Sequence, residues 1–216
     1  NSRFKYAVPD ISGSPRLITN KFGEPFTPSA VFFTEEDKPI VGTEALNAGF
    51  AQPQRLVSDW KRSMGSDDVL YKANDGTEFK AVDMLTILLT DAKENIEAKS
   101  GQVVNEAVIS VPANYSKLQK QQTLDAAAAA GINAILLPHE PTAAALGNGV
   151  HKRKDTTALV YNLGSGTFDV SVLISKGNIC DIIATGGDAG IGGRDFNKRI
   201  SERILEEFEK KNSFRP

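Results

Sequence analysis

Two glycine clusters, with polar residues beside the first, have the residue types and spacing that could do chemistry. The first cluster runs from Gly164 to Thr167, and the second from Gly186 to Gly193. Backbone N–H groups that converge on an anion can hold a phosphate, and glycine lets the chain approach without an obstructing side chain. The second cluster also leads into a predicted helix, whose N-terminus carries partial positive charge. Both clusters are candidate phosphate loops.

Each cluster taken alone is more often a plain tight turn. The polar residues around the first cluster favour the phosphate interpretation. Asn162 ends one predicted strand, and Thr167 and Asp169 begin the next. Thr167, Asp169 and Ser171 share one face of that strand because side chains alternate. A polar row beside a glycine turn is poorly explained by packing.

Two common nucleotide motifs are excluded by the sequence. It contains no G-x-x-x-x-G-K-[ST] run. The Gly164–Gly166 pair lacks the third glycine and the following helix that a dinucleotide-binding fold requires.

Composition narrows the class of protein. The 216 residues are 40% hydrophobic and 24% charged, which suits one large domain or two smaller lobes. The net charge of −2 argues against a nucleic-acid binder, and the basic run 151–154 is expected to be a solvated loop. One cysteine, Cys180, predicts a reducing compartment and a core thiol in a strand. No apolar run reaches membrane-spanning length.

Hydrophobic periodicity predicts the elements that position these residues. An antiparallel meander is expected first, then two helices, a strand–helix–strand–helix run, a second antiparallel unit and a final amphipathic helix. Ser116 and Gln119 predict a capping box, Ala126–Ala130 a helix face packed on a sheet, and Pro141 the first turn of a helix. The expected strands are 3–8, 16–19, 30–33, 106–111, 133–137, 157–161, 167–175 and 179–184, with a turn at 176–178; the expected helices are 44–50, 82–98, 116–131, 141–146 and 195–211.

Seven short motifs make the chain resemble the ATPase domain of the 70-kDa heat-shock chaperones. They occur in that family's order and approximate spacing, so together they are far more specific than any one alone. The motifs are Thr27-Pro28-Ser29, Val41-Gly42, Lys61-Arg62, Val111-Pro112-Ala113, the run 140–145, the run 164–169 and the run 192–196.

The resemblance implies an α/β, actin-like (ribonuclease H-like) ATPase fold with ATP in a cleft between two lobes. Residues 1–155 are then lobe I, with a base subdomain formed by 1–28 and 101–155 and an upper subdomain formed by 29–100. Residues 156–216 are the first part of lobe II, which is expected to be incomplete here. The first phosphate loop is expected just before Asn1, and the adenosine-binding helix beyond Pro216.

The resemblance also implies roles for individual residues. Lys61 matches a lysine that contacts the γ-phosphate and the attacking water, although alone it would be taken for a surface lysine. Glu140 matches an acidic residue near the magnesium waters. The remaining assignments are Thr167 and Asp169 as catalytic residues, Gly164, Ser165, Gly166, Thr167, Gly192 and Gly193 as nucleotide-binding residues, and Asn162 and Asp169 as indirect, water-mediated Mg²⁺ contacts.

Four positions depart from the family pattern. Asn162 stands where the family usually has aspartate, and an amide can neither accept a proton nor neutralise Mg²⁺ as well. His139 replaces an asparagine, Ser165 replaces a glycine, and Arg194 stands where an acidic residue is common. The sequence therefore predicts a divergent member that binds ATP and hydrolyses it slowly.

Two functions follow from the resemblance. The first is a chaperone ATPase, active in the stress response, whose nucleotide state controls client proteins held by a separate domain; its cofactors are ATP or ADP with Mg²⁺. J-domain co-chaperones, nucleotide-exchange factors and a cytoplasmic location are expected, with neither nucleic acid nor membrane as partner. The second is a non-hydrolysing partner or regulator that holds ATP as a structural ligand. A sugar or acetate kinase of the same fold class is disfavoured by the seven motifs.

Overall fold

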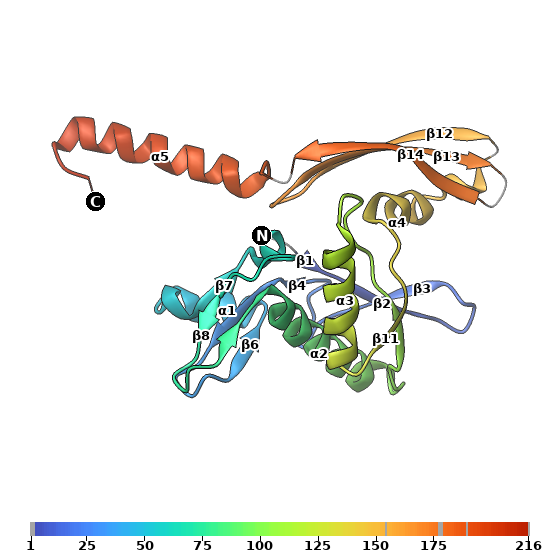
Figure 1. Ribbon diagram of the computed structural model, residues 1–216, viewed down its shortest axis with the longest axis horizontal. Helices are drawn as coiled ribbons and strands as arrows, with labels where there is room; N and C mark the ends of the chain where they lie inside the picture. Colours follow the sequence, from blue (N-terminus) through green and yellow to red (C-terminus); the bar gives the residue numbers. More distant parts are fainter. Residues whose placement is uncertain (1–2, 154, 177–178, 189, 216) are drawn as a thin grey trace. The chain divides into compact units, whose positions relative to one another are not determined.

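The structure is a computed structural model that describes residues 3–153, 155–176, 179–188 and 190–215. The architecture is mixed α/β, with several small sheets in place of one large one (Figure 1). The chain divides into two compact units, residues 2–140 and residues 141–216. Each unit has its own buried residues.

The strands of unit 2–140 form small, mostly antiparallel sheets. The hairpin of β2 (Tyr6–Pro9) and β3 (Pro15–Ile18) confirms the first predicted pairing. The prediction that β5 (Ala30–Phe33) continues this meander is wrong, however. Strand β5 pairs instead with β6 (Pro39–Val41) and β7 (Leu56–Ser58). All four residues of β5 are buried, so this strand takes a central position, whereas β3 is mostly exposed. Two further pairs are β1 (Arg3–Phe4) with β4 (Thr27–Pro28), and β8 (Tyr71–Lys72) with β9 (Glu78–Phe79).

Helices α2 (Ala81–Ser100) and α3 (Lys117–Ala129) supply residues to the main core of this unit. Helix α1 (Thr43–Gly49) packs on a smaller cluster with β5. The short 3-10 helices η1 (Pro53–Arg55) and η2 (Trp60–Ser63) lie between α1 and α2 in the chain. The apolar face predicted for α2 is buried from Leu85 to Ile96, with Met84 fully enclosed beside it.

The capping box of α3 is confirmed, since Gln119 N–H donates to Ser116 Oγ at 3.2 Å. Ala126 and Ala127 are fully buried in the same core cluster as the apolar face of α2. The alanine run of α3 therefore packs against a helix as well as the sheet that was expected. Small side chains let the two helices approach closely.

One parallel strand pair completes unit 2–140. Strand β10 (Glu106–Val108) pairs with β11 (Asn133–Leu136), which is the strand–helix–strand unit that the sequence predicted. Strand β10 ends earlier than predicted, and Val111 instead makes a single bridge to His139. That bridge leads directly into α4 (Glu140–Gly147), the helix expected around Pro141.

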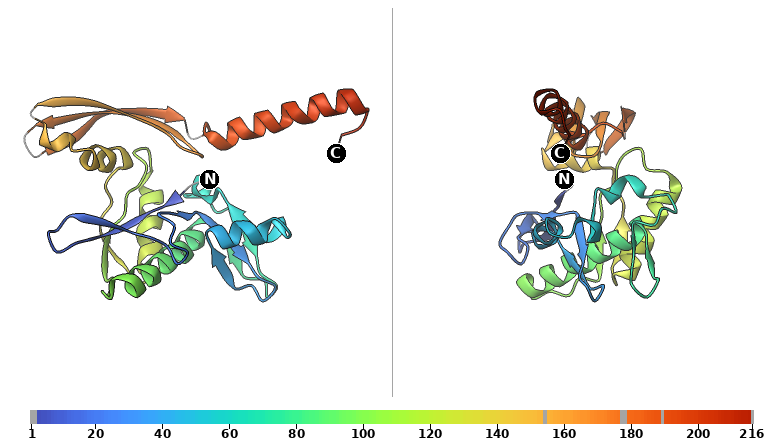
Figure 2. Two further views of the ribbon diagram at one scale, coloured as in Figure 1. Left: turned by 180° about the vertical axis from the view of Figure 1, so that it is seen from behind. Right: turned by 90° about the vertical axis from the view of Figure 1, so that its left-hand side faces the viewer.

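The described residues of unit 141–216 form a three-stranded antiparallel sheet and a long helix. The sheet order is β12 (Thr156–Leu163), β13 (Phe168–Lys176) and β14 (Ile179–Asp188), which confirms the second antiparallel unit (Figure 2). The 3-10 helix η3 (Val150–Lys152) precedes it, and α5 (Gly193–Asn212) follows it. Residues 177 and 178 of the predicted turn lie outside the described residues. Cys180 is half-buried on the edge strand β14, so it is not the core thiol that was expected.

Candidate functional site

The hairpin of β12 and β13 brings the predicted polar residues onto one face. Asn162 lies directly opposite Asp169, and Val160 lies opposite Ser171. Asp169 is 5% exposed and Ser171 is 1% exposed, so the polar face of this strand is its buried face. The row predicted from alternation is therefore confirmed as one face, and Asn162 joins it through the strand register.

The glycine turn closes this hairpin with local hydrogen bonds. Gly164 N–H donates to the Thr167 carbonyl oxygen at 2.9 Å. The Thr167 hydroxyl donates to Asp169 Oδ2 at 3.1 Å. This bond orients the carboxylate of Asp169 beside the turn. The hydroxyl, the carboxylate and the Asn162 amide thus form one polar cluster at the end of the sheet.

The two glycine clusters contact each other, which the sequence did not predict. Gly193 N–H donates to the Gly164 carbonyl at 3.0 Å, and Arg194 N–H donates to the Ser165 carbonyl at 2.9 Å. Helix α5 therefore begins against the turn between β12 and β13. Its first N–H groups bond to the turn in this structure, so the turn and the start of the helix form one backbone assembly.

Lys61 and Glu140 form a second cluster, in unit 2–140. Lys61 lies on η2 and Glu140 at the start of α4, 79 residues apart in sequence, and Lys61 Nζ is 2.6 Å from Glu140 Oε1. The Glu140 N–H donates to the Val111 carbonyl at 2.7 Å, which fixes the backbone that carries the carboxylate. The side chains are 35% and 26% exposed, so solvent reaches both.

Sequence reasoning missed two residues beside this ion pair. His139 Nε2 lies 3.1 Å from Lys120 Nζ, and burial followed by the charge of Lys120 lowers the pKa of His139. Tyr115 is partly buried, and its pKa is raised first by burial and then by the negative charge of Glu140. His139 was predicted only as a departure from the family pattern. No polar pattern in the sequence distinguishes Tyr115 from a core aromatic.

The predicted site residues thus fall into two groups, one in each unit. Lys61 and Glu140 belong to unit 2–140, and all the others belong to unit 141–216. Within the described ranges, no three His, Cys, Asp or Glu side chains are grouped to bind a metal ion directly. None of the helices there combines the length and hydrophobicity that a membrane span needs.

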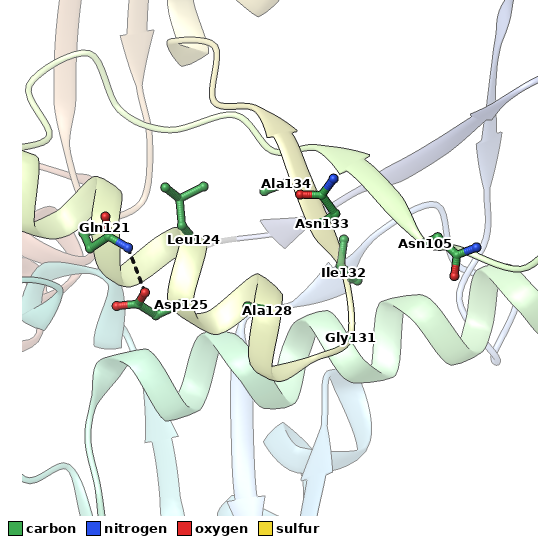
Figure 3. A pocket seen from close by; sticks show the side chains of 9 residues that line it. All are labelled: Asn105, Gln121, Leu124, Asp125, Ala128, Gly131, Ile132, Asn133 and Ala134. Carbon is green, nitrogen blue, oxygen red and sulfur yellow. Dashed lines mark hydrogen bonds between the residues drawn. The ribbon is translucent and has the colours of Figure 1, made fainter.

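One surface groove contains none of these residues. It is an open groove of about 700 Å³ between α3 and the start of β11, shown in Figure 3. Leu124 and Ala128 of α3 and Ile132 supply its apolar part, and Asn105 and Asn133 its amides. Asp125 is the charged residue of its lining, and it accepts a hydrogen bond from Gln121 at 2.8 Å. The lining includes no cationic side chain that could pair with a phosphate, so the groove does not replace the two polar clusters as the candidate site.

Comparison with known families identifies the class of protein. The family model described as Hsp70 protein matches residues 7–215. Because the match covers nearly all of the sequence, the chain belongs to the Hsp70 protein family, and the resemblance drawn from the seven motifs is confirmed. Membership implies the actin-like ATPase fold and identifies a chaperone-type nucleotide-binding domain. Domains of this family bind ATP or ADP with Mg²⁺.

Proposed function

We propose that this chain is the nucleotide-binding domain of an Hsp70-like chaperone that binds Mg·ATP and hydrolyses it slowly to control client proteins. We infer slow hydrolysis from Asn162 and Asp169, which face each other beside the glycine turn. A family member with two carboxylates there would hold more negative charge for Mg²⁺ and a second proton acceptor. Here Asp169 is the one carboxylate of the pair.

The donor set fits Mg²⁺ bound mainly through water and phosphate. Mg²⁺ usually keeps several waters and takes only one or two carboxylates from a protein. Asp169, oriented by Thr167, supplies one such carboxylate, and Asn162 supplies an amide oxygen. Bound Mg·ATP provides the phosphoryl group and neutralises part of its charge. The backbone of Ser165, Gly166 and Thr167 faces the phosphates in this proposal, with Gly192 and Gly193 supporting the turn.

Lys61 and Glu140 have complementary roles in the proposed site. Lys61 places a cation at the γ-phosphate and at the attacking water, where negative charge develops. Glu140 holds the ammonium group at 2.6 Å. Its carboxylate would also interact with waters of a bound Mg²⁺. Neither the Asn162 amide nor the Lys61 ammonium can accept a proton from water. Asp169 is then the one proton acceptor of the facing pair, so we expect less general-base help and slow hydrolysis.

The proposed domain has the two lobes and the partners that are typical of the Hsp70 family. Residues 1–155 form the first lobe, with 29–100 as its upper subdomain, and residues 156–216 belong to the second. Clients, J-domain co-chaperones and exchange factors are the proposed partners, with a role in the stress response and a cytoplasmic location. Their support is the match to the family over residues 7–215. The second candidate function is the non-hydrolysing regulator, which the Asn162 amide favours.

A single-turnover assay with the intact protein distinguishes the two functions. Wild type, Asn162→Asp and the control Asn197→Asp, which changes an exposed asparagine on α5, are each mixed with Mg·ATP in the absence of partner proteins. We expect wild type to bind ATP and turn it over slowly, and Asn162→Asp to be faster by roughly 10²-fold. Binding without turnover in wild type would establish the regulator instead. Absence of ATP binding would contradict both.

A further inference from the structure

The turn that follows η2 is held by two glutamine side chains from α3. Gly65 N–H donates to Gln122 Oε1 at 2.7 Å, and Gln119 Nε2 donates to the Met64 carbonyl at 2.9 Å. These bonds join positions 57 and 55 residues apart in the sequence, and both are partly buried. Buried backbone groups need hydrogen-bond partners. The two glutamines therefore satisfy adjacent backbone groups of one turn.

The geometry of Gly65 explains why the turn fits against α3. Its φ of +87° lies in the left-handed region that glycine adopts easily. A Cβ at Gly65 would stand 2.8 Å from Gln119 Cγ, so the backbone lies directly on the glutamine side chain. The neighbouring Met64 is only 3% exposed and belongs to the core cluster formed with α2 and α3. The turn is thus fixed by packing and by hydrogen bonds.

Gln119 is itself held in one orientation. Its Oε1 accepts the Ser116 N–H at 2.8 Å, which leaves Nε2 to donate to Met64. The inward face of α3 is polar at its start, where Gln119 and Gln122 meet the turn, and alanine-rich later, where it packs on α2. The two glutamines therefore lie where the helix meets the partly buried backbone groups of the turn.

The turn is continuous with the helix that carries Lys61. Met64 N–H donates to the Lys61 carbonyl at 3.4 Å, closing η2. The Lys61 ammonium in turn reaches Glu140 at 2.6 Å. A shift of the turn would move the ammonium relative to this carboxylate. In enzyme sites a misplacement of about 1 Å can cost roughly 10²-fold in rate.

We propose that Gln119 and Gln122 are positioning residues, which fix Lys61 through the Met64–Gly65 turn. The inference rests on the proposed function, which gives Lys61 its role at the nucleotide phosphates. Neither glutamine lies within the seven family motifs of this chain. The proposed contact from α3 is therefore additional to the roles that those motifs imply.

The first test needs no nucleotide. Gln122→Met keeps the side-chain length without the acceptor, Gln122→Glu keeps the acceptor, and Gln121→Met changes an exposed glutamine whose side-chain amide donates to Asp125 on the same helix. Amide hydrogen exchange at Gly65 is measured by NMR in the intact protein. We expect exchange about 5-fold faster in Gln122→Met, the factor that corresponds to one lost hydrogen bond, and little change in the other two. Unchanged exchange in Gln122→Met would overturn the proposal.

The second test uses Mg·ATP. We expect Gln122→Met to lower the single-turnover rate by up to roughly 10²-fold, with ATP affinity within about 2-fold, and Gln122→Glu to restore the rate. An equal loss in Gln121→Met, or a rate like wild type in Gln122→Met, overturns the proposal.

The NMR signal of the Lys61 ammonium separates this proposal from the proposed function. If wild type does not hydrolyse ATP, the proposed ATPase fails, and the Lys61 signal then decides the positioning role. The positioning role is supported if the chemical shift of the Lys61 ammonium changes in Gln122→Met and has its wild-type value in Gln122→Glu. A signal that does not change overturns it.

Discussion

Gly192 lies directly against the backbone of Ser165: a Cβ at Gly192 would come within 2.4 Å of the Ser165 carbonyl oxygen. The φ of Gly192 is −165°, an extended conformation open to any residue, so close approach alone requires glycine here. The contact joins the turn between β12 and β13 to the start of α5. Two sequence motifs 28 positions apart (192 minus 164) thereby become one backbone assembly.

Replacing Gly192 by alanine is therefore expected to destabilise unit 141–216. The added methyl group meets backbone atoms that cannot rotate away, and such overpacking typically costs about 1–3 kcal/mol. Urea unfolding measures the loss, and ATP titration should show weaker binding. Gly186→Ala is the matched control, because no atom lies within 4 Å of the place that its methyl group would take. Equal stability of the two variants would contradict the close contact.

Removing the ammonium of Lys61 is expected to abolish hydrolysis while leaving ATP binding largely intact. In Lys61→Ala the developing charge on the γ-phosphate loses its cation, but the glycine turn is untouched. The ion pair with Glu140 is partly solvated, so its loss should change the free energy of unfolding by about 1 kcal/mol or less. Single-turnover assays and ATP titration measure the two effects. A loss of affinity as large as the loss of rate would show that Lys61 serves binding.

A second carboxylate at position 162 is expected to make folding of the hairpin sensitive to Mg²⁺. In Asn162→Asp two like charges face each other across β12 and β13. Such a pair destabilises a sheet by up to about 1 kcal/mol. Unfolding measured without Mg²⁺ should show this loss, and millimolar Mg²⁺ should reverse it. Asn197→Asp adds the same charge on α5 and should respond to Mg²⁺ no more than wild type does.

Asp91 on α2 is expected to reduce stability at neutral pH. Burial raises the pKa of Asp91 in the folded protein, with Lys21 opposing the rise. The folded state then binds a proton more tightly than the unfolded state, so stability falls as pH rises through the folded pKa. Asp91→Asn should be more stable than wild type at pH 7, with the difference shrinking toward acid pH. Glu94→Gln removes a neighbouring charge that also raises the pKa of Asp91, so it should weaken this pH dependence in part.

His139 is expected to make the protein acid-sensitive. Burial and Lys120 lower the pKa of His139 on folding, so the unfolded state takes up the proton more readily. The stability that neutral His139 contributes is present above the ordinary histidine pKa of about 6.5 and is lost as pH falls below it. The midpoint temperature of thermal unfolding should therefore fall more steeply between pH 7.5 and pH 5 for wild type than for His139→Gln. Parallel curves would exclude His139 as the source.

The periodic elements could be predicted because local sequence determines them. The apolar face of α2, the Ser116–Gln119 capping box and the alternation along β13 depend on neighbouring residues only. The family was also recognisable, since short motifs in order are a property of the sequence. The strand partners of β5 were not predictable, because burial on both faces depends on segments brought from elsewhere in the chain.

The sequence by itself determined the α/β class, the family and the polar row beside the glycine turn. Only the tertiary structure decided which distant groups meet: Lys61 with Glu140, Gly192 with Ser165, and Gln122 with Gly65. Each of these contacts joins segments far apart in the chain. No local pattern encodes such pairs, because they arise from how the elements pack and which buried backbone groups then need partners.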